Sequence, residues 1–272
     1  MINAHAAGLM NIGVAEKVVL CPVCGSELNL VERDVLPAVL CEQWELSDQE
    51  RRAVNRREGD ICSQCGNSLR LMAFAKTIQS VLRNRHGIGA QFFADFAESL
   101  RQANPDISIW ECNNLSVLHQ YLQDTPGLVY TEFGSSIPGI PSEDLMGLSF
   151  SDDFFDLVLM TDVLEHVPDL DLALRELVRV LKSDGSIVLT VPVLMNRKTR
   201  QRAILDERGE LKKTLEPSYH GAPGTSEDDM LVVHEFGHDV ISVFKAYFDV
   251  AMYNEEELPF GANTVFVLRK CF

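Results

Sequence analysis

The stretch FSDDFFDLVLMTDVLEHVPDLDLALRELVRVLKSDGSIVLTVP, residues 150–192, decides the fold of the chain. Its apolar run DLVLMTDV (156–163) is typical of a buried strand, and SIVLTVP (186–192) is typical of another. Between them, residues 170–182 carry apolar positions at helical spacing. Two buried strands joined by a helix predict parallel strands covered by helices.

The same alternation continues on both sides of this stretch. The further predicted elements are strands at 107–111, 128–133, 248–253 and 264–270, and helices at 69–82, 92–100, 116–123 and 236–246. The last two strands are close enough in sequence to form a closing antiparallel pair. We therefore expect a doubly wound α/β fold with a mostly parallel sheet over residues 105–272.

The charge of the chain argues against some classes of partner. Against 40 Asp and Glu the sequence has 24 Lys and Arg, a formal net charge of -16, which disfavours a broad nucleic-acid surface. The excess is local, since residues 131–180 hold two Arg against eleven acids, whereas 194–213 hold seven Lys and Arg against three acids. Because no apolar run reaches about 18 residues and residues 1–17 lack the pattern of a secretory signal, we expect a cytoplasmic protein without a membrane span.

Four cysteines lie in two C-x-x-C-G sequences, CPVCG at 21–25 and CSQCG at 62–66. Both thiolates of each sequence can reach one tetrahedral Zn²⁺, which makes Cys21, Cys24, Cys62 and Cys65 the expected ligands of a structural zinc site. The interval between the pairs is unusually long, and a charged, solvated helix at 47–58 with Ser47 as its N-cap fills it. Two unconnected pairs or a redox dithiol are the alternatives, and Cys41 is expected to be a spectator.

These features divide the chain into three parts. Residues 1–75 are predicted to form a zinc-ribbon-like module and 76–104 a helical connector. The α/β domain then occupies 105–272, and residues 194–238 form an insertion on the side where the substrate is expected to bind.

Residues 150–192 resemble the class I S-adenosylmethionine-dependent methyltransferases, and in particular the type 11 family. The likeness is carried by SDDFFDLV before the fourth strand, DVLEHV after it and RVLKSDG before the fifth strand, and in general form it covers 105–272. It implies a seven-stranded Rossmann-like sheet and S-adenosylmethionine as cofactor. The cysteine pairs followed by Ser68-Leu69-Arg70 are similar to a subgroup with a zinc module ahead of this domain.

The resemblance also implies roles for residues at the carboxyl ends of the strands, where open parallel sheets bind ligands. Glu132 would accept the ribose hydroxyls, Asp144 and Leu145 would bind the adenine, and Thr161, Asp162 and Val163 would line the floor near the methionine part. His166 would pack beside the cofactor. The full set is Glu111, Cys112, Asn113, Glu132, Asp144, Leu145, Thr161, Asp162, Val163 and His166. For any one acid alone, a helix N-cap or a solvated loop is the alternative.

The first loop departs from the family pattern. It reads WECNNLS at 110–116 and contains no glycine, although the family has a glycine-rich loop there. Asn113 and Asn114 tolerate positive φ better than most residues, so they are compatible with the turn. A relative that has lost cofactor binding is the alternative.

The insertion at 194–238 holds the candidates for the catalytic base. His220, His234 and His238 are the candidates, because an imidazole with a pKa near neutrality suits deprotonation of a hydroxyl or amine. His220 ranks first because its small, turn-forming neighbours leave it free to face a cleft. HEFGH (234–238) has the letters of the H-E-x-x-H zinc motif, but the expected third-ligand pattern is missing. Basic residues at 194–213 either attract an anionic acceptor, such as an acidic sugar, or belong to an exposed helix or hairpin.

Three functions are compatible with these patterns. The first is methylation of an oxygen on a small molecule or a sugar or glycan precursor. The second is RNA methylation, which the net charge and the absence of an N/D-P-P-Y/F tetrad after the fourth strand disfavour. The third is binding without catalysis by a degenerate methyltransferase fold.

Overall fold

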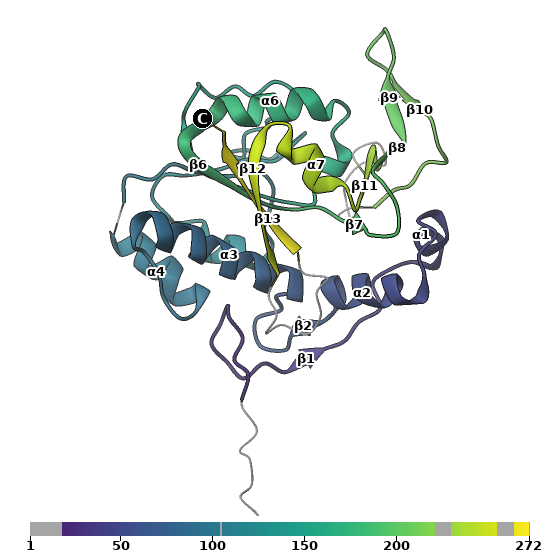
Figure 1. Ribbon diagram of the computed structural model, residues 1–272. Helices are drawn as coiled ribbons and strands as arrows, with labels where there is room; N and C mark the ends of the chain where they lie inside the picture. The colour runs from purple at the N-terminus through teal and green to yellow at the C-terminus, as the bar shows by residue number, and fades with distance from the viewer. Residues whose placement is uncertain (1–17, 104, 221–229, 255–263, 272) are drawn as a thin grey trace, which may run out of the picture.

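The computed structural model describes residues 18–103, 105–220, 230–254 and 264–271 (Figure 1). Residues 1–17, where no secretory signal is expected, lie outside this range. The helices are α1 (Ala38–Gln43), α2 (Asp48–Gly59), α3 (Leu69–His86), α4 (Phe93–Ala103), α5 (Val117–Leu122), the 3-10 helix η1 (Leu164–His166), α6 (Leu170–Val180) and α7 (Val240–Lys245). The strands are β1 (Leu30–Val31), β2 (Ile61–Cys62), β3 (Ile109–Glu111), β4 (Leu128–Tyr130), β5 (Phe155–Thr161), β6 (Leu181–Thr190), β7 (Val193–Leu194), β8 (Arg200–Gln201), β9 (Ala203–Leu205), β10 (Leu211–Lys213), β11 (His234–Gly237), β12 (Phe248–Asn254) and β13 (Thr264–Lys270).

The central sheet has the order β12-β13-β6-β5-β3-β4. Four strands, β4, β3, β5 and β6, run parallel to one another. Strand β13 lies antiparallel between β6 and β12, so the expected closing antiparallel pair is confirmed. Within the described ranges this sheet has six strands rather than the expected seven. The segment after β4 forms no strand, and its Pro138 and Pro141 have no amide hydrogen to donate to a neighbour.

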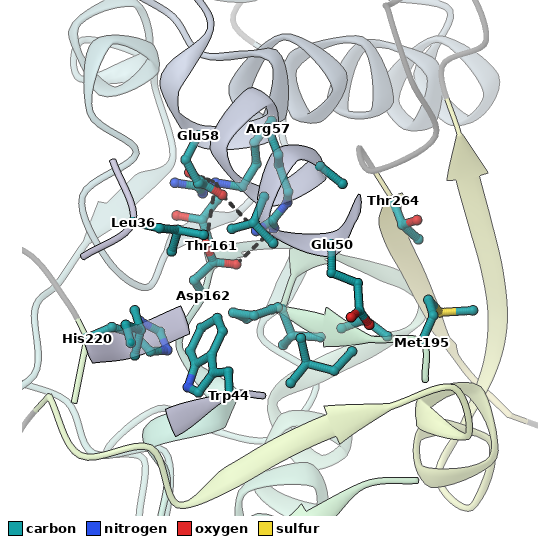
Figure 2. Close-up of a pocket in the computed structure, with 18 of the residues that line it drawn as sticks. Leu36, Trp44, Glu50, Arg57, Glu58, Thr161, Asp162, Met195, His220 and Thr264 are labelled. Atoms are coloured by element: carbon teal, nitrogen blue, oxygen red, sulfur yellow. Dashed lines mark hydrogen bonds and ion pairs between the residues drawn. The ribbon is translucent and has the colours of Figure 1, made fainter. Parts of the chain in front are cut away.

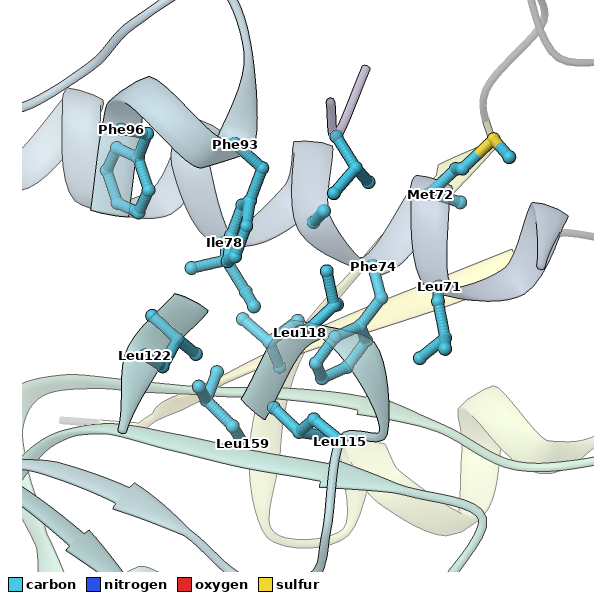
Figure 3. Packing of buried hydrophobic residues seen from close by; sticks show 14 of the residues in the cluster. Leu71, Met72, Phe74, Ile78, Phe93, Phe96, Leu115, Leu118, Leu122 and Leu159 are labelled. Carbon is cyan, nitrogen blue, oxygen red and sulfur yellow. The ribbon is translucent and has the colours of Figure 1, made fainter. Parts of the chain in front are cut away.

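The sheet is apolar on both faces because alternate residues of each strand point in opposite directions. On β5, Leu157 and Leu159 pack in one cluster with residues of α3, α4 and α5, whereas Val158 and Met160 pack in a second cluster with residues of α6 and α7. Figure 3 shows the first of these layers, with the helices lying across Leu159. The doubly wound α/β class is therefore confirmed, and it places the carboxyl ends of β3, β5 and β6 at one edge.

The N-terminal part of the chain packs against this domain. Ser47 is the N-cap of helix α2, as the sequence predicts, and it forms a capping box in which Ser47 and Glu50 each accept from the other's backbone amide. The helix is not solvated all round, since only 7% of Arg57 and of Asn55 is exposed. Helix α3 ends in a turn at Gly87, whose φ is positive at 70°.

The region 193–245 differs from its prediction. Residues 234–237 form β11, which pairs with β7 through Phe236 and Val193 and with β8 through His234 and Gln201, so the helix predicted at 236–246 begins only at Val240. Residues 203–213 form the β9–β10 hairpin, one of the two forms foreseen for the basic segment. Among the described residues, no helix is both long and apolar enough to cross a membrane.

Candidate functional site

A cavity of about 1330 Å³ opens beyond the carboxyl ends of β5 and β6. Thr161 and Asp162 line it from the end of β5, and Trp44 and Arg57 line it from the N-terminal part (Figure 2). His220, from the segment before β11, completes a third side. The cavity is therefore built from three regions that are far apart in the sequence, at the edge where such sheets bind ligands.

The structure brings part of the predicted site together in this cavity. The predicted residues that line it are Asn113, Thr161, Asp162, His166, His220 and His238. The predicted residues outside its lining are Glu111, Cys112, Glu132, Asp144, Leu145, Val163 and His234. Cys112, Leu145 and Val163 instead share the apolar cluster that contains α6.

Asp162 is held by two arginines from the N-terminal part. Its Oδ1 lies 3.2 Å from Nη2 of Arg57 and its Oδ2 lies 3.3 Å from Nε of Arg70, while Glu58 binds both arginines at 2.7 and 2.9 Å. Burial raises the pKa of Asp162, but Arg70 and Arg57 outweigh it, and the pKa is lowered overall. Asp162 also has a positive φ of 52°, the kind of backbone strain that is concentrated at functional sites.

The glycine-free first loop is fixed by side chains. The side chain of Asn113 donates to the Thr161 carbonyl and accepts from the Thr161 amide, both at 3.0 Å, which joins the ends of β3 and β5. Glu111 accepts from the Leu115 amide at 3.0 Å and lies 2.8 Å from Nδ1 of His119. Positive φ occurs at Ser116 (56°) and at neither Asn113 nor Asn114, so the loop does not use the conformational tolerance of the two asparagines.

Burial raises the pKa of Glu111, and His119 partly offsets this effect. Glu111 is fully buried. Its carboxylate is therefore committed to holding the loop rather than directed at the cavity.

The residues expected to bind the adenosine part of the cofactor lie outside the lining of the cavity. Glu132 follows β4, is partly exposed and accepts a hydrogen bond from the Tyr130 hydroxyl. Burial and that bond raise the pKa of Tyr130 to about 12, so the phenol keeps its proton. Asp144 accepts from the Met146 amide at 2.8 Å, which closes a turn beside the buried Leu145.

A carboxylate and two imidazoles meet beside the cavity. Ligand atoms of Glu165, His166 and His220 all lie within 4.8 Å of one another. The imidazole rings of His166 and His220 have centroids 4.9 Å apart, and Trp44 meets the His220 ring edge-on at 5.2 Å. Burial, with a smaller effect of His166, lowers the pKa of His220 to about 4, so its ring is neutral at pH 7.

The other two candidate bases are placed less favourably. His234 is buried on β11, behind the cavity wall, and burial lowers its pKa. His238 is exposed at the cavity lining. HEFGH forms a strand with a following turn rather than a helix, so its histidines do not share a face one helical turn apart as a zinc protease needs, which excludes that reading.

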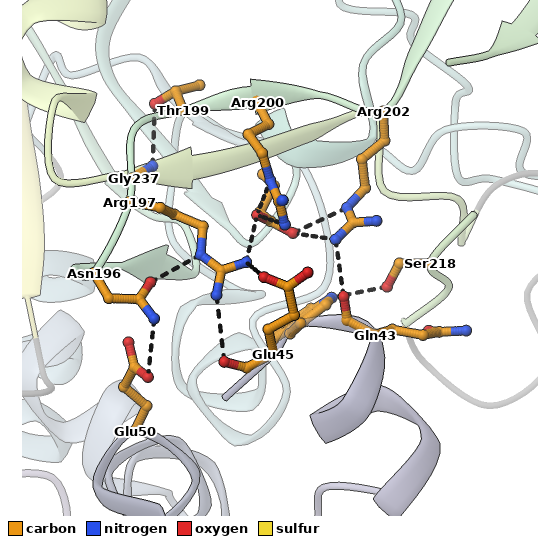
Figure 4. Close-up of polar contacts among 12 residues, drawn as sticks. Gln43, Glu45, Glu50, Asn196, Arg197, Thr199, Arg200, Arg202, Ser218 and Gly237 are labelled. Atoms are coloured by element: carbon orange, nitrogen blue, oxygen red, sulfur yellow. Dashed lines mark hydrogen bonds and ion pairs between the residues drawn. The ribbon is translucent and has the colours of Figure 1, made fainter. Parts of the chain in front are cut away.

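The basic segment is largely neutralised within the protein. Glu235 is 4% exposed and accepts from Nε of Arg200 at 2.7 Å and Nε of Arg202 at 2.9 Å, and Nη1 of Arg197 lies 3.3 Å from it (Figure 4). Arg197 also contacts Glu45 of the N-terminal part at 3.5 Å. These arginines hold the insertion against the N-terminal part, which leaves less charge for an anionic acceptor than the sequence suggests.

The four cysteines of the two C-x-x-C-G sequences lie together. Sγ of Cys21 is 3.7 Å from that of Cys65, and Sγ of Cys24 is 4.0 Å from that of Cys62. All four are free thiols, and their ligand atoms lie within 4.8 Å of one another. Gly25 and Gly66 have positive φ of 75° and 74°, which is the turn that lets backbone amides face the sulfurs.

Sequence reasoning missed the contributions of the N-terminal part and of Glu165. Trp44, Arg57 and Arg70 line the cavity, although α2 reads as a solvated helix in the sequence. Their partners Ser218 and Asp162 lie far along the chain, so local pattern carries no signal for them. Glu165 stands inside the quoted DVLEHV, and the adjacency of an acid and a histidine was the one available sign.

Residues 135–189 match the family model described as a methyltransferase domain. No curated protein matches the chain. Among solved structures, the chain is similar to a 1,6-didemethyltoxoflavin-N1-methyltransferase from Burkholderia thailandensis with 14% identity, a TM-score of 0.41, and coverage of 89% of this chain and 95% of that one. It is also similar to an S-adenosylmethionine-dependent methyltransferase from Mesorhizobium loti, with 15% identity, a TM-score of 0.37, and coverage of 65% and 98%.

The family model covers β5, α6 and nearly all of β6, and Thr161 at the end of β5 lines the cavity. The matched segment therefore lies within residues 105–272, where the resemblance to methyltransferases is expected. The chain thus contains a segment that matches a methyltransferase domain and, ahead of it, an N-terminal part with four clustered cysteines.

Proposed function

We propose that this protein is an S-adenosylmethionine-dependent methyltransferase that acts on an oxygen atom of a small molecule or of a sugar or glycan precursor. The observation that carries the proposal is one cavity that joins two kinds of side chain. Asn113, Thr161 and Asp162 line its sheet edge, where the cofactor is expected, and His166 and His220 line another side. A cofactor and an acceptor bound in the same cavity would meet between these sides.

The amino-acid part of S-adenosylmethionine would lie against Asp162 and Arg70. Nη1 of Arg70 is shielded from solvent and has no hydrogen-bond partner among the described residues, while its Nε is engaged by Glu58 and Asp162. A guanidinium N–H is a strong donor to a carboxylate, and a carboxylate is the matching acceptor for an ammonium group. The two side chains thus fit the two charged ends of a methionine moiety.

The adenosine part would lie toward β4. Glu132 stands at the carboxyl end of that strand. Its carboxylate accepts from the Tyr130 hydroxyl and would also accept from the ribose hydroxyls. Cys112 and Leu145 belong to one apolar cluster and would border the adenine ring, with Asp144 at its edge. Val163, just beyond the carboxyl end of β5, packs against the same cluster and would extend this apolar border.

The acceptor would bind at the imidazole side. When bound, S-adenosylmethionine supplies a methyl group on a positively charged sulfur, and the acceptor oxygen must lose its proton as it attacks in line. His220 is neutral at pH 7, and its Nε2 is shielded and without a partner among the described residues, so it has the capacity to take that proton. His238 is the second candidate, from its exposed place on the lining, and the buried His234 is the third.

The same proposal includes a structural Zn²⁺ held by Cys21, Cys24, Cys62 and Cys65. Zinc–sulfur bonds of about 2.3 Å in a tetrahedron put two sulfurs about 3.8 Å apart. The distances of 3.7 and 4.0 Å found here fit that value. The proposal divides the chain into a zinc module at 1–75, a connector at 76–104 and a methyltransferase domain at 105–272. Helix α3 crosses the boundary at residue 75 without a break.

The proposal is tested by calorimetric titration of the protein with S-adenosylhomocysteine. We expect one site per chain in the wild type and at least tenfold weaker binding in Glu132→Ala, because the ribose loses its acceptor. Asp124→Ala, which removes an exposed acid between α5 and β4, is the matched control and should bind as the wild type does. Equal affinity in Glu132→Ala and the control would refute the ribose assignment, and no binding by the wild type would refute the proposed function.

A further inference from the structure

Glu165 is an ionisable side chain that the proposed reaction leaves unused. It belongs to η1, directly after β5, and is 1% exposed. Both of its carboxylate oxygens are shielded from solvent, and neither has a hydrogen-bond partner among the described residues. A buried polar group without a partner costs about 1–3 kcal/mol, and a charged one costs more, so a native protein seldom keeps one without a purpose.

The arginines nearby do not serve as its partners. Arg57 and Arg70 are engaged by Asp162 and Glu58, so two positive charges already face two negative ones. Burial and the charge of Asp162 raise the pKa of Glu165 well above its ordinary range. Among the described residues the Glu165 carboxyl group has no hydrogen-bond partner, and a cation placed beside it would supply a favourable contact.

Two imidazoles, of His166 and His220, lie close to the Glu165 carboxylate. Nδ1 of His166 lies 3.0 Å from the Leu231 carbonyl, which can only accept, so Nδ1 carries the hydrogen and Nε2 carries the lone pair. That Nε2 lies 3.8 Å from Oε1 of Glu165. Nε2 of His220 is shielded and unpartnered among the described residues. A backbone carbonyl that fixes the tautomer of an imidazole is the usual support of a metal-ligating histidine.

From this geometry we infer that Glu165, His166 and His220 form a second metal site, which takes a divalent ion of the zinc or iron type. Their ligand atoms lie within 4.8 Å of one another, and bonds of about 2.0–2.1 Å to one ion would bring them to about 4 Å or less, a small side-chain rotation. Two imidazoles and one carboxylate suit such ions better than Mg²⁺ or Ca²⁺. This site is distinct from the four cysteines, which would hold the structural ion.

The place of the three ligands gives the ion a role. His166 and His220 line the large cavity, whereas Glu165 lies behind them beside Pro192 and Val232. Three protein ligands leave the remaining positions of the ion open toward the cavity, as in catalytic metal sites. Because one carboxylate balances one of the two positive charges, the site keeps a net charge of +1 and would favour an acceptor that binds through an oxyanion.

The inference rests on the proposed function for its substrate class, namely an acceptor whose reacting hydroxyl binds the ion. A bound divalent ion lowers the pKa of such a hydroxyl, which would then attack the methyl group as its anion. In the metal-bound protein His220 would therefore act as a ligand, and the proton of the acceptor would leave to solvent when the acceptor binds. The existence of the site itself does not depend on that chemistry.

The test is calorimetric titration with Zn²⁺ of the full chain in which the cysteine site already holds zinc. We expect one further Zn²⁺ per chain in the wild type and in His238→Ala, a matched control on the same cavity lining. Glu165→Gln, which keeps the shape of the side chain, should weaken this binding at least tenfold, and His220→Ala should abolish it. Retention of the cysteine-bound zinc and of the unfolding transition shows that each variant is folded.

Absence of a further zinc in the wild type would overturn the inference, as would equal binding by the wild type, Glu165→Gln and His220→Ala, which would place the ion elsewhere. Titration of the same samples with S-adenosylhomocysteine separates the two proposals. A protein that binds the second zinc but not S-adenosylhomocysteine would retain the metal site and contradict the proposed function. Binding of S-adenosylhomocysteine without a second zinc would retain the proposed function and contradict the metal site.

Discussion

Asp162 joins the N-terminal part of the chain to the end of β5. Its partner Arg57 stands 105 positions earlier in the sequence, and the arginine side chain is only 8% exposed. An arginine buried to this extent requires a carboxylate, because the cost of removing its charge from water must be offset by pairing. The pair therefore fixes both the wall of the cavity and the position of the strained residue at its floor.

Replacement of Asp162 by Asn should lower the free energy of unfolding at pH 7 by about 2 kcal/mol, since two arginines keep only Glu58 as a partner. The folded-state pKa of Asp162 lies below its unfolded value, so the unfolded chain binds more protons as the pH falls. The stabilisation is complete above about pH 4, near the unfolded-state pKa of an aspartate, and it is lost progressively as the pH falls toward the lower folded-state pKa. The difference between wild type and variant should therefore be smaller at pH 3 than at pH 7. Urea unfolding at pH 7 and at pH 3 measures the difference.

Asp171→Asn is the control for that experiment. Asp171 pairs with Arg175 on the exposed surface of α6, with 57% and 66% of the two side chains exposed. Exposed pairs of this kind contribute less than about 1 kcal/mol, so this variant should stay close to the wild type. An Asp162→Asn protein as stable as the control at pH 7 would show that the two arginines do not depend on Asp162.

Local sequence signals predict individual elements well where the element is determined by its own residues. Ser47 is the expected N-cap of α2, and β13 covers the predicted strand at 264–270. The helix predicted from residue 236 failed at its start because Phe236 pairs with β7 and His234 with β8, contacts that no local pattern encodes. Residues of the site follow the same division, because Asn113 and Asp162 lie at strand ends, whereas Arg57 and Trp44 reach the cavity only through tertiary packing.

The proposed zinc module is the element on which we expect the position of α2 to depend. Strand β2 contributes Cys62, and α2 ends directly before that strand, with Arg57 in its last turn. Loss of the metal should release this end of α2 and remove one wall of the cavity, because metal-centred modules of this kind owe their folding to the ion.

Cys62→Ser should therefore hold one zinc ion per chain fewer than the wild type and should bind S-adenosylhomocysteine at least tenfold more weakly. Cys41→Ser is the control, because Cys41 lies in α1 apart from the four clustered thiols. Metal analysis and calorimetry on the same samples measure both effects. Unchanged zinc content in Cys62→Ser would contradict the four-cysteine site, and unchanged affinity would contradict the coupling to the cavity.

At the scale of the whole molecule, the N-terminal part, the sheet and the insertion close on one another around the cavity. Trp44 donates from its indole to the Ser218 hydroxyl at 2.8 Å and packs with Leu194 and Val232, and Arg202 donates to the Gln43 carbonyl at 3.1 Å. The net charge of -16 is unevenly spread, with acids at the strand ends and arginines in the insertion. Much of that basic charge is used to bind Glu235 and Glu45, so the asymmetry seen in the sequence is largely internal.

The central claim is that this cavity is the site where cofactor and acceptor meet, and a crystal structure of the protein with S-adenosylhomocysteine tests it most directly. We predict that the methionine carboxylate lies at Arg70, that the ribose hydroxyls lie at Glu132 and that the sulfur faces the side of the cavity lined by His166 and His220. Density for the ligand elsewhere, or its sulfur turned away from these histidines, would contradict the account.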